Sequence, residues 1–202
     1  MLDARLERWL EALVRTPGLT SVADVAEARR VHVEDALAAL PLLEEGPVVD
    51  VGSGGGSPGL PLAAARPDLR FVLLEASRRK CAFLRVSASS FPNVEVVCAR
   101  AEEHARAAGR DAYAVALARA LAPPAVAAEW CLPLVRPGGI LVLFAGESGD
   151  LRPVAAALAA EGPEAIPVAG SSSKRLLVFR KFGPTPERFP RRPGVARRRP
   201  LA

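Results

Sequence analysis

Apolar residues recur at helical spacing through the first 44 residues of the chain. The first such stretch carries six of them on one face of a predicted helix: Leu2, Leu6, Trp9, Leu10, Leu13 and Val14. The segment Thr16-Pro17-Gly18 ends this helix. A second helix is predicted from about Val22 to Leu43, with a break near Val31.

From Pro47 onward the pattern changes to short apolar runs that alternate with helical segments. Strands are expected at Pro47–Val51, Arg70–Glu75, Val94–Ala99, Tyr113–Leu117 and Ile140–Ala145. Helices are expected at Leu60–Ala65, Arg78–Ala88, Glu102–Ala107, Ala125–Leu134 and Leu151–Ala160. Because the strands are apolar on both faces, this alternation predicts an α/β fold with a doubly wound, mostly parallel sheet.

The last fifth of the chain departs from this alternation. Two final runs, Ala165–Val168 and Arg175–Arg180, are too close in sequence for a crossover helix, so we expect them to pair antiparallel. Five prolines and many arginines then predict an extended tail that a partner would order. The expected organisation is a helical segment over residues 1–44, an α/β domain over 45–182 and a basic tail over 183–202.

Positive charge is concentrated at this end of the chain. The 202 residues carry a net charge of +5, yet ten of the 27 Lys and Arg residues follow residue 173, where Glu187 is the one acid. Most of the 27 are Arg, whose planar guanidinium suits phosphate and base recognition. Two interpretations stay open: a solvated tail in an arginine-rich composition, or an anionic partner such as nucleic acid.

Composition excludes several other classes of protein. With 50% hydrophobic and 24% charged residues, the chain is neither disordered nor fibrous. No apolar run approaches the roughly 20 residues that span a bilayer. Cys81, Cys98 and Cys131 include no CxxC pair, which argues against a disulfide framework and a cysteine zinc site. We therefore expect a cytoplasmic monomer with no metal and no membrane segment.

The segment from Asp50 to Pro61, DVGSGGGSPGLP, carries the clearest chemical signal. It leaves a predicted strand and enters a helix, which is where ligands of open α/β sheets bind. Gly52, Gly54 and Gly56 allow positive φ angles and close approach of a ligand to the backbone. Glu75 ends the next strand, where a carboxylate can accept hydrogen bonds from both hydroxyls of an adenosine ribose.

Two cofactors compete for this segment. Gly54, Gly56 and Gly59 match the dinucleotide pattern GxGxxG, which favours NAD. However, the tight turn begins earlier, at Gly52, and Asp50 stands where dinucleotide folds usually carry an apolar residue. A buried carboxylate there suits the ammonium group of S-adenosylmethionine (AdoMet) and repels a pyrophosphate. AdoMet is therefore favoured over NAD, with a purely structural turn as the third interpretation.

Two later segments add candidates at the same edge of the sheet. Ala101 and Glu102 follow the third α/β strand, where an adenine ring can lie, although an acid there also suits the dipole of a helix N-terminus. Arg119 follows the fourth strand and is expected to face the site. Its structural alternative is a salt bridge to Glu75 or Asp50.

Other nucleophiles and bases are scarce. No cysteine is placed for attack on a base carbon, and Ala122-Pro123-Pro124-Ala125 lacks the polar and aromatic residues of amine methylases. Of the two histidines, His104 falls in a polar helix and is expected to be solvated, so no strong general base is evident. A guanine N7 needs none, because its lone pair attacks directly and no proton leaves it.

A series of motifs follows in order along the chain: Leu19-Thr20-Ser21-Val22, His32-Val33-Glu34-Asp35-Ala36, the glycine segment, Leu74-Glu75-Ala76-Ser77-Arg78-Arg79-Lys80, Ala101-Glu102-Glu103, Ala118-Arg119-Ala120-Leu121-Ala122-Pro123, Trp130-Cys131-Leu132-Pro133-Leu134 and Pro137-Gly138-Gly139. With the tail, these motifs resemble the bacterial 16S rRNA guanine-N7 methyltransferase family, also called the glucose-inhibited division protein B family.

This resemblance implies a class I AdoMet-dependent methyltransferase, Rossmann-like, that methylates a guanine N7 of 16S rRNA near the decoding site of the small ribosomal subunit. It implies AdoMet contacts from Gly52, Ser57, Ala101, Glu102 and Arg119, to which the residue-level argument adds Asp50, Gly54, Gly56 and Glu75. Arg119 is a positioning candidate, and no residue is assigned as certainly catalytic. The candidates for RNA binding are His32, Arg119, Arg191, Arg192, Arg197, Arg198 and Arg199.

The chain departs from the family pattern at Gly18, Val31, Ala36 and Ala145, and only eighteen residues precede the Leu-Thr-Ser motif. Ala145 replaces a Lys that the family places after the fifth strand, so a positive charge is missing from the expected active face. RNA affinity would then depend more on Arg119 and the tail. Two alternatives stay open: a non-catalytic or retargeted ribosome-binding member of the fold, and an NAD-dependent oxidoreductase.

Overall fold

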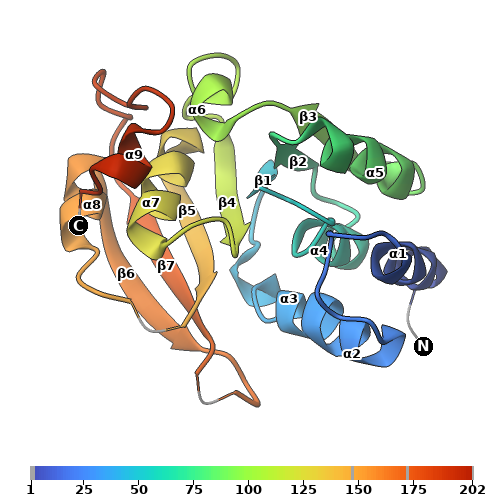
Figure 1. Ribbon diagram of the computed structural model, residues 1–202. Helices are drawn as coiled ribbons and strands as arrows, with labels where there is room; N and C mark the ends of the chain where they lie inside the picture. Colours follow the sequence, from blue (N-terminus) through green and yellow to red (C-terminus); the bar gives the residue numbers. More distant parts are fainter. Residues whose placement is uncertain (1–2, 147, 172, 202) are drawn as a thin grey trace.

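A seven-stranded sheet in the order β3-β2-β1-β4-β5-β7-β6 lies at the centre of the molecule (Figure 1). The structure is a computed structural model that describes residues 3–146, 148–171 and 173–201. Its strands are β1 (Val48–Val51), β2 (Phe71–Glu75), β3 (Val94–Cys98), β4 (Tyr113–Arg119), β5 (Val135–Ala145), β6 (Ala160–Pro167) and β7 (Arg175–Lys181). The first five strands are parallel, and β7 is antiparallel to β5 and β6, so the expected fold class is confirmed.

Helices precede, connect and follow these strands. They are α1 (Ala4–Arg15), α2 (Val25–Arg29), α3 (Asp35–Leu37), α4 (Gly59–Ala65), α5 (Arg78–Ala88), α6 (Ala101–His104), α7 (Pro124–Cys131), α8 (Arg152–Ala157) and α9 (Val195–Arg198). A π-helical turn, Arg30–Glu34, joins α2 to α3, which is the break expected near Val31. The predicted helix over Leu151–Ala160 is too long, because β6 already begins at Ala160.

Alternate residues of the central strands pack on opposite layers of helices, as the pleat of a strand requires. Val49 and Val72 belong to an apolar cluster with α6, α7 and α8. Phe71 of β2 packs with α4 and the segment after α3, while its neighbour Leu73 packs with α1, α4 and α5. Because both faces are covered, β1, β2 and β4 are mostly apolar, as the sequence pattern indicated.

Helix α1 is attached to this sheet through its apolar face. Trp9, Leu10 and Leu13 are buried, and each contributes about 1.5–3 kcal/mol of burial free energy. The indole Nε1 of Trp9 also donates to the carbonyl oxygen of Gly55 at 2.7 Å. The N-terminal helical segment therefore packs directly on the glycine segment.

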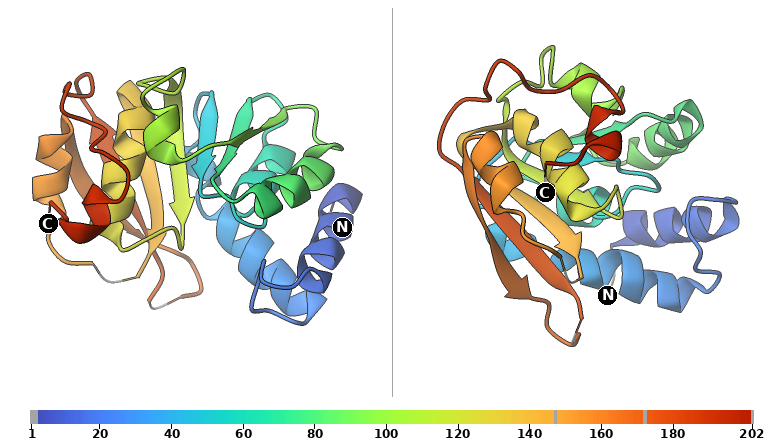
Figure 2. Two further views of the ribbon diagram at one scale, coloured as in Figure 1. Left: turned by 45° about the horizontal axis from the view of Figure 1, so that its top comes forward. Right: turned by 60° about the vertical axis from the view of Figure 1, so that its left-hand side comes forward.

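The expectation of an extended tail ordered by a partner is wrong for the tail that the structure describes. Residues 183–201 fold back over α6 and α7, and α9 lies beside α7 (Figure 2). Phe189 and Ala196 are buried in this contact. Helix α9 forms between Pro193 and Pro200, because four residues free of proline are enough for one turn.

Two smaller expectations also need correction. Cys81 of α5 and Cys98 at the end of β3 form a disulfide, with their Cα atoms 5.9 Å apart, because α5 packs beside β3. Cys131 is free and buried. His104 is half-buried rather than solvated, and its Nε2 shares a hydrogen bond of 2.7 Å with the hydroxyl of Tyr113.

Within the described ranges, no helix has both the length and the apolar character needed to traverse a bilayer.

Candidate functional site

Three adjacent cavities follow the carboxyl ends of the parallel strands. The Glu75 cavity, about 390 Å³, is lined among others by Glu75, Ala101 and Glu102. The glycine-loop cavity, about 200 Å³, is lined by residues 52–55, Ser57, Lys80 and others. The Arg175 cavity, about 610 Å³, lies beyond it between the ends of β5 and β7. Ala120 lines all three cavities and has a positive φ of 52°.

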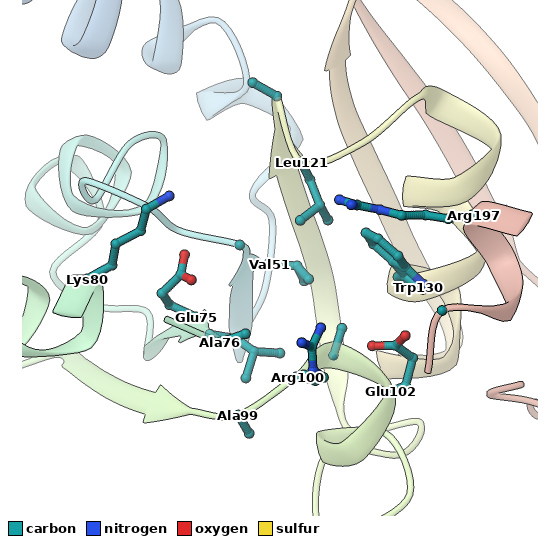
Figure 3. A pocket seen from close by; sticks show the side chains of 15 residues that line it. Val51, Glu75, Ala76, Lys80, Ala99, Arg100, Glu102, Leu121, Trp130 and Arg197 are labelled. Carbon is teal, nitrogen blue, oxygen red and sulfur yellow. The ribbon is translucent and has the colours of Figure 1, made fainter. Parts of the chain in front are cut away.

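The Glu75 cavity has two buried carboxylates in its wall. Glu75 is 8% exposed; its Oε2 accepts a hydrogen bond from Gly54 N at 3.0 Å, and its Oε1 accepts one from Ser77 N at 2.7 Å. Glu102 is 5% exposed in the first turn of α6. Figure 3 shows Glu75 and Lys80 on one side of this cavity and Trp130 on the other. Glu75 therefore joins the cavity wall to the glycine segment.

The glycine segment turns tightly at the end of β1. Gly52, Gly54 and Gly56 have φ angles of +71°, +56° and +104°, a region in which side chains are strained. A Cβ at Gly52 would lie 2.4 Å from Leu121 Cδ1, so glycine is also required by packing. Ser57 Oγ donates to the carbonyl oxygen of His32 at 2.7 Å. The glycine segment therefore forms part of the cavity wall, and through Ser57 it also holds the π-helical turn in place.

Asp50 lies behind this turn and is not among the residues that line the three cavities. It is 1% exposed, and its Oδ2 accepts a hydrogen bond from Gly59 N at 3.0 Å. Its Oδ1 has no hydrogen-bond partner among the described residues. Burial raises the pKa of Asp50 to about 7, against the lowering effects of the Gly59 hydrogen bond and the Arg119 charge. Asp50 fixes the start of α4 and is the buried acid behind the cavity.

Arg119 does not form the salt bridge to Glu75 or Asp50 that the sequence left as its alternative. One guanidinium nitrogen donates to the carbonyl oxygen of Val31 at 2.7 Å, and the other to Nδ1 of His32 at 2.7 Å. Since Arg is only a donor, His32 Nδ1 must be the acceptor, and its proton lies on Nε2. That Nε2–H donates to Thr20 Oγ1 at 2.8 Å.

His32 is therefore a neutral residue that links Arg119 to Thr20. Burial and the charge of Arg119 lower the pKa of His32 to about 4, while Asp35 opposes the shift. Burial also lowers the pKa of Arg119. His32 and Asp35 share the Arg175 cavity but do not bond to each other, because Asp35 forms an ion pair with Lys174.

The Arg175 cavity combines an apolar floor with a basic rim. Phe144 and Val168 contribute apolar surface, while Lys174, Arg175 and Arg119 contribute positive charge. Ala145, where the family pattern has Lys, lines this cavity and lies directly opposite Arg175 in the antiparallel register. Lys174 and Arg175 were not among the sequence candidates, since only the pairing of β7 with β5 brings them to this edge.

The tail arginines are not equivalent. Arg191 forms an ion pair with Glu129, which is 2% exposed, and Arg197 lines the Glu75 cavity beside Trp130. Arg192, Arg197, Arg198 and Arg199 are all exposed, and of these four only Arg197 also lines a described cavity. Lys80 and Trp130 are further cavity residues that sequence reasoning missed, although both lie within its quoted motifs.

In the part of the chain that the structure describes, no three His, Cys, Asp or Glu side chains are arranged to hold a metal ion.

Comparison with known families gives one consistent result. Residues 4–158 match the model of the family described as rRNA small subunit methyltransferase G. The chain is 38% identical over 197 residues to the ribosomal RNA small subunit methyltransferase G of Moorella thermoacetica, covering 91% of this chain and 82% of that protein. It is 43% identical over 187 residues to the protein of the same name from Rubrobacter xylanophilus, covering 84% and 72% of the two chains.

Several solved structures of low sequence identity resemble this one. The precorrin-6y C5,15-methyltransferase of Geobacter metallireducens superposes with a TM-score of 0.53 at 18% identity, covering 85% of this chain and 95% of that one. TYW2 of P. horikoshii, in complex with MeSAdo, gives a TM-score of 0.58 at 13% identity, covering 75% and 62%. At these identities the similarity establishes the fold alone.

Proposed function

We infer that this chain, which belongs to the rRNA small subunit methyltransferase G family, is an enzyme that transfers a methyl group from AdoMet to a guanine N7 of 16S rRNA. The observation that carries the proposal is the row of three cavities. The glycine-loop cavity shares Gly52, Lys80 and Ala120 with the Glu75 cavity, and it shares Arg119, His32 and Ala120 with the Arg175 cavity, so a cofactor in the first two cavities would adjoin a base in the third. We further propose that the protein acts as a monomer in the cytoplasm, on the small ribosomal subunit.

The residues around the first two cavities fit AdoMet. Glu75 and Glu102 offer carboxylate acceptors for ribose hydroxyls and an amine, and Ala101 offers backbone and apolar surface. Gly52 and Gly54 adopt positive φ angles that favour glycine, and because glycine has no side chain, a ligand can approach the backbone of the loop. Asp50 is a buried acid with a free oxygen, which suits a cationic ligand nearby. The same acid disfavours the pyrophosphate of NAD.

The chemistry requires little beyond alignment. AdoMet, when bound, supplies a methyl carbon on a sulfonium sulfur. The guanine N7 lone pair forms the new N–C bond, the C–S bond breaks, and its electron pair stays on sulfur. No proton leaves N7, so this reaction requires no general base. His32, neutral and held by Arg119 and Thr20, keeps the wall between the two cavities rigid.

The Arg175 cavity is the proposed site for the target base. Its apolar floor suits a base removed from its stack, and its basic rim suits the flanking phosphates. Extrusion of the base is needed because the deep groove of A-form RNA hides N7. Since one small domain has few surfaces for sequence recognition, we expect the assembled or partly assembled subunit, rather than free rRNA, to be the substrate.

The test is methyl transfer to small subunits purified from cells that lack the modification. We expect labelled methyl from AdoMet to enter 16S rRNA, and aniline cleavage to map one N7-methylguanine in the decoding region. Absence of label from every substrate, with AdoMet binding intact by calorimetry, would favour the non-catalytic alternative. Binding of NAD in place of AdoMet would favour the oxidoreductase. Equal transfer to naked rRNA and to subunits would exclude the proposed preference for subunits.

A further inference from the structure

The tail, residues 183–201, is fixed to the domain from its first residues. Lys181, the last residue of β7, has a fully buried side chain. Its Nζ, which has three N–H donors, lies within hydrogen-bond distance of four acceptors: the carbonyl oxygens of Leu132 and Val135 at 2.9 and 2.7 Å, and Asp111 Oδ1 and Thr185 Oγ1, each at 2.5 Å. Thr185 in turn donates through its backbone to Asp111 Oδ2 at 3.1 Å. The tail therefore leaves the sheet in one defined direction.

Two arginines of the segment before β4 bind the middle of the tail. Arg110 donates to the carbonyl oxygens of Thr185 and Phe189, each at 2.7 Å. Arg106 donates to the carbonyl oxygen of Pro190 at 2.9 Å. The carbonyl groups of this proline-rich segment have no partners in a helix or a sheet, and the two guanidinium groups supply hydrogen bonds to them instead. The ring of Phe189 is 3% exposed, so this part of the tail is also held by burial.

A second clamp fixes the end of the tail. Arg191 forms a two-pronged ion pair with Glu129 of α7, and Glu129 is 2% exposed. The same guanidinium donates to the carbonyl oxygen of Arg199 at 2.8 Å, which closes the chain around α9. A bidentate pair with one fully buried partner fixes orientation as well as position. This ion pair therefore holds α9 against α7 at Glu129, the residue that precedes Trp130.

This clamp brings the tail to the Glu75 cavity. Gly194 and Arg197 line that cavity, and the guanidinium carbon of Arg197 lies 5.2 Å from the centre of the Trp130 ring. Figure 3 shows Arg197 and Trp130 together on the side opposite Glu75 and Lys80. The indole Nε1 of Trp130 is buried and has no hydrogen-bond partner among the described residues. The tail side of the cavity therefore carries a flat cation and an aromatic ring.

We propose that the tail forms the outer wall of the adenosine end of the cofactor site, with Arg197 binding the adenine of AdoMet and Arg191 positioning Arg197 through Glu129. This inference rests on the proposed function. A planar guanidinium stacks on a purine face and donates to purine ring nitrogens, which are acceptors. Glu75 and Glu102 in the same cavity offset the positive charges of Arg197 and Lys80. The match to the family model ends at residue 158, before the tail.

The test compares ligand binding by single-arginine variants of the full-length chain. Arg197→Ala and Arg191→Ala are expected to weaken binding of AdoMet by about fivefold or more in calorimetry, the size of a cation–aromatic contact. Arg199→Ala, which removes the same charge from an exposed tail position, is the matched control and should change the affinity by less than twofold.

A second ligand separates the adenosine end from the rest of the cofactor. 5′-Methylthioadenosine keeps the adenosine and lacks the amino acid, so Arg197→Ala should weaken its binding by the same factor as that of AdoMet. Quenching of Trp130 fluorescence on binding, absent in Trp130→Phe, gives a readout that does not depend on turnover. Unchanged melting temperature of the unliganded Arg197→Ala protein shows that it folds.

The outcomes separate the two proposals. Wild-type affinity for both ligands in Arg197→Ala overturns the role of the tail and leaves the methyltransferase proposal intact. Loss of subunit binding in Arg197→Ala, with AdoMet affinity unchanged, also overturns the role of the tail in cofactor binding, because it assigns Arg197 to RNA contact instead. A wild-type protein that binds neither ligand overturns the proposed function itself.

Discussion

At the residue scale, folding changes the pKa of Asp50 in a way that experiment can test. Burial raises its pKa to about 7 from an ordinary value of 3.8. Between these two values the folded protein keeps a proton that the unfolded chain has lost. Stability contributed by this group is therefore present at low pH and is lost as pH rises toward 7. A cation bound close to Asp50 favours the ionised form and reverses the shift.

We expect AdoMet, which carries a net positive charge, to release a proton from Asp50 when it binds near pH 7. Calorimetry in two buffers of different ionisation enthalpy measures this release directly. Asp50→Asn, which keeps an acceptor for Gly59 N, should bind with the same heat in both buffers. Equal heats for the wild-type protein in the two buffers would contradict an ionisable group at this position.

Gly59 shows how closely the acid and the helix that follows are packed. A Cβ at Gly59 would lie 2.3 Å from Leu73 Cδ2 and 2.8 Å from Asp50 Oδ2. We expect Gly59→Ala to lower the free energy of unfolding by about 1–3 kcal/mol, because the core must move to admit one methyl group. Gly149→Ala is the control, since nothing lies within 4 Å of its Cβ position. Urea unfolding of the two variants measures the difference; equal stability of both would show that the core adapts freely.

At the scale of elements, the π-helical turn between α2 and α3 determines which groups contact Arg119 at the carboxyl end of β4. It places the carbonyl oxygen of Val31 and the ring of His32 on Arg119, which ends β4. A π turn widens the helix and exposes a carbonyl that an α-helix would use internally. This element joins the N-terminal helices to the site, so their packing on the sheet is part of the site's geometry.

The connection between β7 and the tail depends on the buried Lys181. We expect Lys181→Met to lower the free energy of unfolding by about 3 kcal/mol, because Asp111 and two carbonyl groups lose their partner. Limited proteolysis should cut the variant within residues 183–201 faster than the wild type. Arg180→Met, the exposed neighbour, is the matched control. A tail equally protected in both variants would mean that Arg106, Arg110 and Arg191 are sufficient to hold it.

At the scale of the whole molecule, the three cavities form a path from the tail to the start of β7. The tail closes one end, the glycine loop forms the middle, and the basic rim of Lys174 and Arg175 forms the other end. The positive charge missing at Ala145 is thus matched by Arg175 directly across the strand pair. This distribution favours RNA contact at β7 rather than through the clamped part of the tail.

We expect Lys174→Ala and Arg175→Ala each to weaken binding to the small subunit and to reduce the salt dependence of the logarithm of affinity by about one unit. Lys174→Ala should have the larger effect, since it also leaves Asp35 as an unpaired negative charge in the cavity. AdoMet affinity should not change in either variant. Arg85→Ala, an exposed charge on α5, is the control. Equal losses for all three variants would indicate only a general charge effect.

The sequence by itself determined the order and type of the elements, because periodicity and glycine placement are local properties of the chain. Strands β1 to β4 and helix Arg78–Ala88 follow from apolar patterns that each segment carries alone, whereas the start of β6 at Ala160 does not. The position of the glycine segment after β1, and of Glu75 at the end of β2, follows in the same way. Parallel strands then place their carboxyl ends together, so the edge that carries the site was also predictable.

Tertiary structure alone decided the partners of the charged side chains. Arg119 bonds to His32 rather than to Glu75, Lys181 is buried against Asp111, and Arg191 is paired with Glu129. These partners are about 60 to 90 residues apart in sequence, so no local pattern relates them. A buried charge must find a partner wherever packing brings one within reach, and that choice depends on the whole fold. For this reason the sequence predicted the edge of the sheet at which the cavities lie, but not that Gly194 and Arg197 of the tail line one of them.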